Sequence, residues 1–456
     1  MNIRSVLSPL RIIRVGRKLR GYHLRTAVIT FALASGPASP CQQPPDPALT
    51  LERARERLLA DLDRMPRYTC VQTITRKYYD APSHIQHPAC ATLIKWHQER
   101  KHELSALGWD RMRLEVAIVE GANVYSWVGA PRFDDATLDK LADHGPLGSG
   151  DFGILLSEVL RKTTKITLSF QQEVFVGDRR LFQYSYTIPL EESRYQIKTS
   201  NGWAFTAYRG TVLLDTEAAD IVRLTVRTPE LPADSTGCQA ISEVDYGRTS
   251  IHDRMVLVPR ETRLLSLERA GNETASVTSY ASCREYASTV RMLWDDPPGD
   301  DQPAYAPSRL EEPPPPLPAG LHLNWRLVTP IDSDTAAAGD PIEAVLRSPI
   351  RNKQHVFAPA GAHLHGRLRR VQQRPDPSDH FEIALQFESV EIAGKNVPLT
   401  ATSFSARPRF YAFQKQPISD DPPDVVTFFF NTQHLRLKQL DEEWITISPN
   451  TGKDKK

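Results

Sequence analysis

Residues 111–128, RMRLEVAIVEGANVYSWV, decide the fold class of this chain, because their polarity alternates along the sequence. Apolar side chains stand at every second position from 112 to 118, and mostly charged side chains stand between them. Successive side chains of a β-strand point to opposite faces, so the pattern predicts a strand with one buried and one exposed face. The turn at 120–123 and the apolar run after it predict that the chain returns as a β-hairpin.

The same alternation recurs further along the chain. It returns at 166–170, 182–188 and 222–226, and between these strands only 134–144 and 153–161 favour helix. Strands with one buried and one wet face are typical of antiparallel sheets. We therefore expect one large antiparallel sheet, and a sheet of this size is expected to curl.

A helix is expected over 48–65, ahead of the sheet. Its apolar residues recur at spacings of three and four and line one face, and Thr50 can cap its N-terminus. Pro66 ends the helix. The apolar residues are Leu51, Ala54, Leu58, Leu62 and Met65.

A proline-rich segment at 295–320 divides the chain, because prolines and acidic residues cannot bury a core and favour an extended, semi-rigid linker. The first domain then covers 48–294 and the second 321–448, with a polar tail at 449–456. Short apolar runs separated by Gly, Pro and Asp turns make the second domain a smaller β-barrel or sandwich. The fold class is mainly β.

Residues 1–47 have the layout of a signal peptide followed by a disordered lead. Basic residues precede an apolar stretch at 26–34 and small residues follow it. The apolar stretch is far shorter than the ~20 residues of a membrane-spanning helix, so export to the periplasm or cell surface is expected. Lipidation at Cys41 is the alternative, although Pro40 stands where a lipoprotein signal needs a small residue.

Four cysteines remain after this segment: Cys70, Cys90, Cys238 and Cys283. Four cysteines in an exported protein predict two disulfides with three possible connectivities, and no Cys-x-x-Cys spacing favours a metal. Pairing the neighbours in sequence gives Cys70–Cys90 and Cys238–Cys283, which is the preferred connectivity.

Composition and motifs argue against nucleic-acid binding and catalysis. The 56 Lys and Arg residues nearly balance 55 Asp and Glu residues, so bulk charge offers no footprint for nucleic acid. Ser149 lacks a nucleophile elbow, His97 and His102 are assigned to a solvated loop, and His363 and His365 lack a third metal ligand. We expect a non-catalytic protein without metal or cofactor. An exported hydrolase would need an activity lost on replacing one Ser, His or Glu.

Aromatic side chains are frequent in the first domain, and most are expected to fill its core. A curled sheet with more aromatic residues on its concave face than its helices cover leaves an apolar cavity able to take an acyl chain. The candidate cavity residues are Trp127, Phe152, Phe170 and Tyr208.

The apolar-apolar-Asp strand end at 213–215 and the returning apolar-Arg-apolar strand at 221–224 carry a family resemblance. With the helix at 48–65 and the strand at 68–74, they resemble the periplasmic lipoprotein-localisation-factor superfamily over about 48–290. This resemblance implies an unclosed, half-open β-barrel capped by helices, and an acyl-chain or lipoprotein carrier or a sensor that borrowed the cavity.

Two further resemblances concern short motifs. Tyr68-Thr69-Cys70 and Cys283-Arg284-Glu285-Tyr286 are similar to motifs of an uncharacterised group of soil-bacterial envelope proteins. Turn residues within 327–399 resemble those in the β-barrel domain of type IV secretion channel subunits, which implies a second domain that docks an envelope protein partner. They are Ile331-Asp332-Ser333, Gly339-Asp340, Ala358-Pro359-Ala360-Gly361 and Gly366-Arg367.

Two function classes follow for this chain. The first is an envelope binding protein for a lipid or lipoprotein. The alternative is a structural scaffold with a filled core and no ligand.

Overall fold

The computed structural model describes residues 45–448, apart from 64–66, 82–88, 101–103, 120–121, 131–152, 164, 200–201, 286–313, 376–378, 405–409 and 412–420. The expected signal peptide, most of the proline-rich linker, the polar tail, the helix at 134–144 and the side chains of Phe152, Ser149 and His102 lie outside the described residues.

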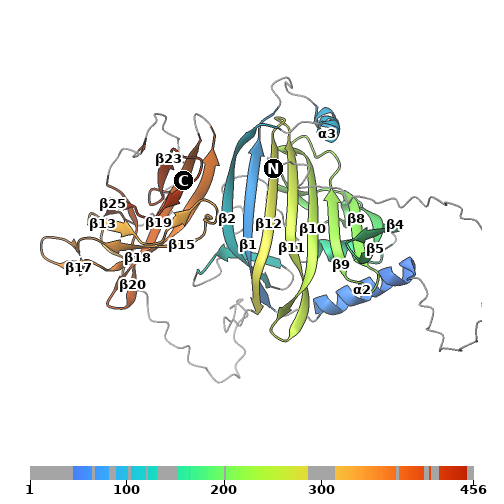
Figure 1. Ribbon diagram of the computed structural model, residues 1–456, viewed down its shortest axis with the longest axis horizontal. Helices are drawn as coiled ribbons and strands as arrows, with labels where there is room; N and C mark the ends of the chain where they lie inside the picture. Colours follow the sequence, from blue (N-terminus) through green and yellow to red (C-terminus); the bar gives the residue numbers. More distant parts are fainter. Residues whose placement is uncertain are drawn as a thin grey trace, which may run out of the picture.

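A large antiparallel sheet forms the first part of the molecule, here called the N-terminal sheet (Figure 1). Its strands follow the order β3-β2-β1-β12-β11-β10-β9-β8-β5-β4. Within the described residues the edge strands β3 and β4 do not pair with each other, so the sheet stays open. The mainly β fold class and the hairpin at 111–128 are confirmed. The strands are β1 (Tyr68–Tyr79), β2 (Ala106–Val119), β3 (Ala122–Trp127), β4 (Thr167–Val176), β5 (Arg179–Ile188), β8 (Tyr208–Asp215), β9 (Ile221–Arg227), β10 (Gly237–Ile251), β11 (Arg254–Glu268) and β12 (Glu273–Glu285).

Two helices, α2 (Pro47–Asp63) and α5 (Ile154–Leu160), cover one face of this sheet. Figure 1 labels α2. Ala54 and Leu58 of α2 join side chains of α5 and of strands β5, β8, β9 and β10 in one buried cluster. No helix in the described part of the chain combines the length and apolarity that crossing a membrane requires.

The start of α2 differs from the prediction. Asp46, not Thr50, caps the helix, because its Oδ1 accepts a hydrogen bond from the backbone N–H of Ala48 at 2.8 Å. Pro47 then occupies the first helical position, which tolerates its missing N–H. Thr50 lies inside the first turn, where its hydroxyl donates to the Asp46 carbonyl at 2.9 Å.

A third helix, α3 (Cys90–Glu99), corrects the solvated-loop assignment of His97. His97 Nδ1 lies 3.0 Å from Glu273 Oε1, and Arg100 Nη2 donates to Glu273 Oε2 at 2.6 Å. These contacts tie α3 to the start of β12. The loop prediction was wrong because it weighed the polarity of this stretch and missed that Cys90 and Leu93 are buried on one side of a short helix.

Both disulfides exist, but their pairing differs from the preferred connectivity. The bonds join Cys70 to Cys283 and Cys90 to Cys238. Strand β1 pairs with β12, so Thr69 lies opposite Arg284 and Cys70 comes next to Cys283 at a bulge. The pairing predicted from nearness in sequence was wrong because the sheet pairs β1 with β12, its first and last strands in chain order.

The remaining strands form a small barrel, here called the C-terminal barrel. Successive strands pair from β21 through β25, β13, β15, β18 and β19 to β20. Strand β20 then leads along the chain into β21, which completes the circuit. Trp325, Trp444 and Phe387 meet in its core with ring centroids 4.9–5.4 Å apart. The circuit strands are β13 (His322–Leu327), β15 (Pro341–Leu346), β18 (His363–Arg374), β19 (His380–Ile392), β20 (Lys395–Pro398), β21 (Ala401–Ser403) and β25 (Asp441–Thr446).

Short elements complete both parts. They are η1 (Leu190–Glu192), β6 (Gln196–Thr199) and β7 (Gly202–Phe205) beside the N-terminal sheet, and β14 (Ile331–Asp332), β16 (Ile350–Arg351), β17 (Val356–Ala358), β22 (Phe410–Tyr411), β23 (Val426–Phe430) and β24 (Arg436–Leu437) beside the barrel.

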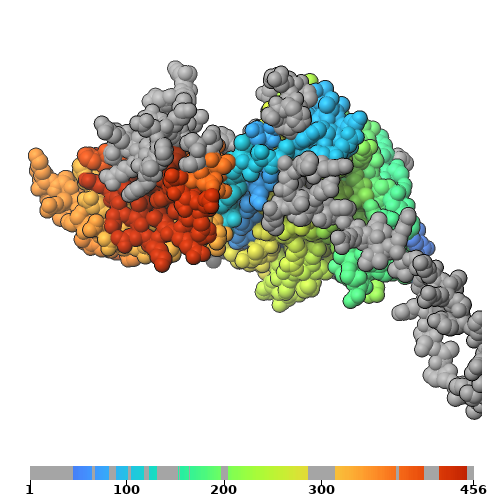
Figure 2. Space-filling model, turned by 45° about the horizontal axis from the view of Figure 1, so that its top comes forward, coloured from blue at the N-terminus to red at the C-terminus, as the bar shows by residue number. Residues whose placement is uncertain are grey.

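The barrel is joined to the sheet along β2 (Figures 1 and 2). Strand β3 covers one half of β2, while β18 pairs with Trp109 and Asp110 in the other half. Arg113 forms an ion pair with Asp340 of the barrel, and Arg111 donates to the Ser333 carbonyl at 3.0 Å. An exposed sheet edge invites pairing with other chains, and the barrel removes part of that edge.

Candidate ligand-binding site on the helix-covered face

Aromatic side chains of three neighbouring strands face the two helices. The Tyr184 hydroxyl of β5 donates to the Pro47 carbonyl at the start of α2, at 2.6 Å. The Tyr208 hydroxyl of β8 donates to Oε2 of Glu158 on α5, also at 2.6 Å. Phe170 of β4 is paired in register with Tyr184, and the two ring centroids are 5.7 Å apart. These residues therefore form a row, here called the aromatic row, on the helix-covered face.

Burial changes steeply along the aromatic row. Tyr184 and Tyr208 are each 1% exposed, whereas Phe170 is 45% exposed. Phe170 lies on β4, which pairs only with β5 among the described strands, so it stands at the free edge of the sheet. The row thus leads from an accessible aromatic ring into the buried core.

Glu158 lies at the buried end of the row and is 3% exposed. Its Oε2 accepts from Tyr208, but its Oε1 has no hydrogen-bond partner within the described residues. Burial raises the pKa of Glu158 above its ordinary value, while hydrogen bonds from the Tyr208 hydroxyl and the backbone N–H of Arg194, and the charges of Arg161 and Arg194, oppose this rise. A buried polar atom without a partner is uncommon in folded proteins and calls for an explanation.

The close approach of β8 to β9 fixes the middle of the row. The Tyr186 hydroxyl donates to the Thr225 carbonyl at 2.6 Å, across the backbone of Gly210. A Cβ on residue 210 would lie 1.8 Å from that carbonyl oxygen and 2.9 Å from the Tyr186 hydroxyl oxygen. Only glycine leaves room for this hydrogen bond.

The four residues nominated from the sequence do not all meet here. Phe170 and Tyr208 lie on the helix-covered face, and Phe152 lies outside the described residues. Trp127 lies elsewhere: the Arg369 guanidinium of the barrel stacks 4.7 Å from its ring centroid. A Cβ on Gly339 of the barrel would lie 2.7 Å from the Trp127 ring. The structure therefore gives Trp127 a packing role between the two parts.

Sequence reasoning missed Glu158, Tyr186 and Tyr184 as site residues. Tyr184 and Tyr186 are visible in the alternating run at 182–188, where they read only as strand residues. Glu158 is the single charged residue of α5, and that isolation is the signal that could have singled it out.

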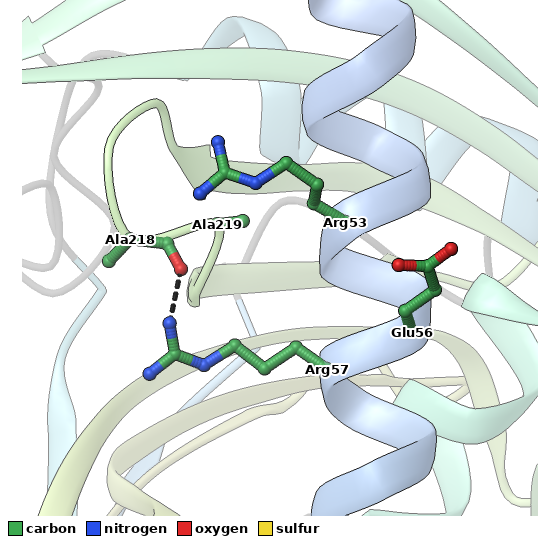
Figure 3. Close-up of a pocket in the computed structure, with 5 residues that line it drawn as sticks. All are labelled: Arg53, Glu56, Arg57, Ala218 and Ala219. Carbon is green, nitrogen blue, oxygen red and sulfur yellow. Dashed lines mark hydrogen bonds between the residues drawn. The ribbon is translucent and has the colours of Figure 1, made fainter.

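A shallow surface hollow of about 360 Å³ lies between α2 and the β8–β9 turn (Figure 3). Its lining is about half polar. Arg53 donates to the Glu217 carbonyl at 3.0 Å, and Arg57 donates to the Ala218 carbonyl. Arg57 Nε also lies 3.1 Å from Asp220. Because both guanidinium groups are engaged with the turn, the hollow is where α2 is fastened rather than an apolar ligand site.

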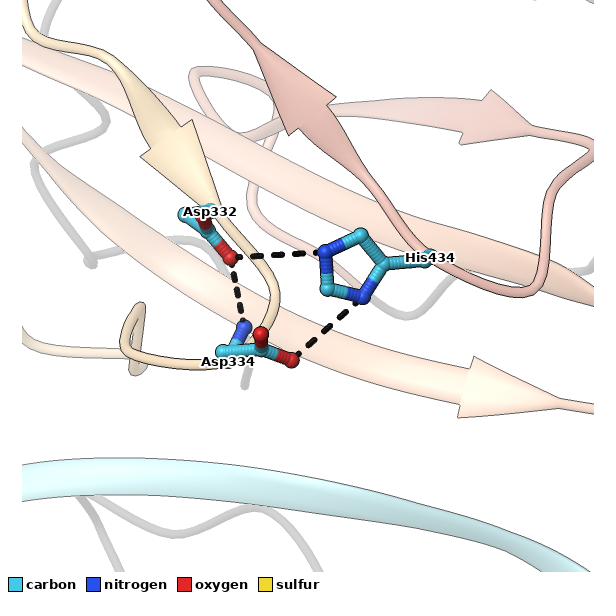
Figure 4. A group of neighbouring side chains, drawn as sticks. All are labelled: Asp332, Asp334 and His434. Carbon is cyan, nitrogen blue, oxygen red and sulfur yellow. Dashed lines mark hydrogen bonds and ion pairs between the residues drawn. The ribbon is translucent and has the colours of Figure 1, made fainter.

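Asp332, Asp334 and His434 gather on the barrel surface (Figure 4). The two carboxylates approach different nitrogens of the ring, with His434 Nδ1 3.4 Å from Asp334 and Nε2 4.0 Å from Asp332. Arg436 Nε lies 3.3 Å from the other oxygen of Asp332. One ion cannot be bound by both ring nitrogens, so this arrangement is that of an ion-pair group.

The histidine pair of β18 has a similar environment. The rings of His363 and His365 stack with centroids 6.4 Å apart. Glu343 lies 3.9 Å from His365 Nδ1 and Glu391 lies 3.8 Å from its Nε2. The carboxylates come from the strands on either side, which sequence spacing cannot reveal, and they again approach opposite ring nitrogens.

No family model and no curated protein match this sequence. Three solved structures are similar at 11% identity: a LolA superfamily protein from Nitrosomonas europaea, a DUF1329 family protein from Desulfovibrio piger, and a domain described as an outer membrane lipoprotein-sorting protein from Vibrio parahaemolyticus. They cover 50%, 54% and 53% of this chain and 92%, 95% and 94% of their own, with TM-scores of 0.25, 0.26 and 0.25. At these scores the similarities say nothing of a ligand or partner.

Proposed function

We propose that this chain is an exported, non-catalytic binding protein of the cell envelope that takes an apolar chain, from a lipid or a lipoprotein, between its helices and its sheet. The observation that carries this proposal is the aromatic row, which runs from the exposed Phe170 at a free sheet edge to the buried Tyr208. Sites for small apolar ligands are lined mainly by hydrophobic and aromatic side chains, as this row is.

The attachment of α2 supports entry beneath this helix. Its buried side chains are Thr50, Ala54 and Leu58, of which two are small. Leu51 and Leu62 are partly buried against the same cluster. Polar contacts add to these, including the ion pair of Asp61 with Arg248 at 2.6 Å. Polar contacts can be exchanged with water at small net cost, so this part of the attachment opposes the opening of α2 only weakly.

Two disulfides support export, because such bonds persist in oxidising compartments such as the periplasm or the cell surface. For the C-terminal barrel we propose the docking of an envelope protein partner. Val356 and Phe404 support this role, since they are 54% and 52% exposed on the barrel.

The alternative is a scaffold with a filled core. It is favoured by the dense cluster of side chains between the helices and the sheet, which a ligand would have to displace. The two functions differ in one property, namely whether the folded protein takes up an apolar molecule.

Dye uptake by the full chain tests the proposal. Nile red is titrated into the wild type, a Phe170→Asp variant, and a Phe404→Asp control whose side chain is exposed to a similar degree on the barrel. We expect saturable fluorescence in the wild type and the control, with affinity reduced about tenfold or more in Phe170→Asp because a charge then stands at the entrance. Absence of saturable uptake by the wild type would favour the scaffold.

A further inference from the structure

We infer that Glu158 selects the polar end of the ligand. The site accepts an apolar chain that ends in a hydrogen-bond donor, such as a hydroxyl, amide or ammonium group, and rejects a chain that ends in a carboxylate. This inference rests on the proposed function and names its ligand chemistry.

The first step is the unmet hydrogen bond. Glu158 Oε1 is buried and has no partner within the described residues, whereas Oε2 is satisfied by the Tyr208 hydroxyl. A buried acceptor left without a donor is destabilising relative to one that is paired. A donor brought by a ligand would supply the missing bond.

The second step is the position of Glu158 relative to the entrance. Phe170 is in register with Tyr184, and Tyr208 is in register with Ile188, four residues further along β5. At ~3.4 Å per residue, Tyr208 lies ~14 Å from Phe170 along the direction of the strands. Tyr186 lies between them, and its ring centroid is 6.0 Å from that of Tyr208. An alkyl chain that enters at Phe170 and follows the row therefore brings its polar end toward Glu158.

The third step is charge. The groups that face Glu158 are the hydroxyls of Tyr208 and Tyr186, the backbone N–H of Arg194 and the cations Arg161 and Arg194. Arg161 is partly engaged by Glu192, 3.8 Å away. Whether the buried carboxyl is ionised or neutral, it presents an oxygen that accepts a hydrogen bond. A ligand carboxylate placed beside Glu158 would add a second acceptor and a second acidic group to a poorly solvated site, which disfavours its binding.

The test compares ligands of one chain length on the full chain. Dodecanol, dodecylammonium and dodecanoate compete with Nile red for the wild type, for Glu158→Gln, and for the control Glu56→Gln, whose side chain lies on α2 beside the surface hollow. We expect the two donors to displace the dye at concentrations about tenfold below dodecanoate in the wild type and the control. In Glu158→Gln this preference should fall to about twofold, because the amide can donate to a carboxylate as well as accept.

The outcomes separate this inference from the proposed function. If the wild type takes up the dye and dodecanoate displaces it as well as dodecanol does, the inference is overturned and the proposed function stands. An unchanged preference in Glu158→Gln overturns it as well. If the wild type takes up no dye, the proposed function is overturned, and the inference that rests on it is overturned with it. Circular dichroism checks that Glu158→Gln is folded, and if it is not, the ligand preference of the wild type decides the inference.

Discussion

Removal of the Cys70–Cys283 bond is the perturbation whose size follows most directly from the structure. The bond closes a loop of 213 residues, and the Cys90–Cys238 bond closes an inner loop of 148. With the inner bond intact, only about 65 residues of the outer loop gain freedom when the outer bond is lost. The loop-closure relation then gives a loss of about 4 kcal/mol in the free energy of unfolding.

The variant is Cys70→Ala with Cys283→Ala. Alanine is preferred to serine because Cys70 is 1% exposed, and a buried hydroxyl without a partner would add its own destabilisation. Urea unfolding followed by circular dichroism measures the change, with an expected loss of about 2–4 kcal/mol. The matched control is Cys90→Ala with Cys238→Ala, which should leave Cys70–Cys283 intact in a non-reducing peptide map.

Two results would refute this reasoning. A peptide map of the wild type that links Cys70 to Cys90 would contradict the register of β1 with β12. A double variant as stable as the wild type would show that the Cys70–Cys283 bond constrains the unfolded chain little, although it joins β1 to β12, the first and last strands of the sheet in chain order.

Two other predictions concern the contact between the two parts and the anchoring of α3. Gly339→Ala should lower the free energy of unfolding by about 2–3 kcal/mol, because its Cβ would lie 2.1 Å from the Arg113 carbonyl oxygen at a φ of +101°. Gly361→Ala, which has no atom within 4 Å of its Cβ, is the control for the positive φ alone. Equal losses of stability in both variants would contradict the close contact at Gly339. Burial alone would raise the pKa of Glu273, but hydrogen bonds from His97 and Arg100 hold it below its ordinary value, so the stabilisation is complete above the unfolded pKa and is lost as the pH falls through the folded one. Arg100→Ala should therefore cost about 3 kcal/mol at pH 7 and less at acidic pH, and a loss that is constant with pH in urea titrations would exclude this origin.

The spacing of apolar residues predicted those elements that are defined within one short stretch of the chain. The alternation at 112–118 and the turn after it predicted β2 and β3, which pair from Leu114 with Trp127 to Val119 with Ala122. The spacing of Ala54 and Leu58 predicted the buried face of α2. In these elements the hydrophobic period follows the geometry of a single strand or helix, so the sequence carries the answer.

Contacts between distant segments could not be predicted in this way. The pairing of Gln372 with Asp110 joins the barrel to β2, and no periodicity reports which strand edge a second domain will cover. The disulfide pairing and the position of Trp127 depend on the same kind of information. Trp127 was nominated for a ligand cavity because it is aromatic, but its surroundings are set by Gly339 and Arg369, more than 200 residues away.

The candidate site shows the same division. Aromatic content pointed to Phe170 and Tyr208, and the structure places both on the helix-covered face. Glu158 could not be identified as a site residue from the sequence, because its role depends on the packing of α5 on β8, which leaves one carboxyl oxygen without a partner among the described residues.

Native mass spectrometry of the full chain, with lipid extraction of the same sample, tests the central claim that the protein takes an apolar chain along the aromatic row. The proposal predicts a bound mass that added dodecanol displaces and that Phe170→Asp fails to retain, while Phe404→Asp retains it. An apo mass in every sample, with no uptake of dodecanol by the wild type, would contradict the claim and leave the scaffold.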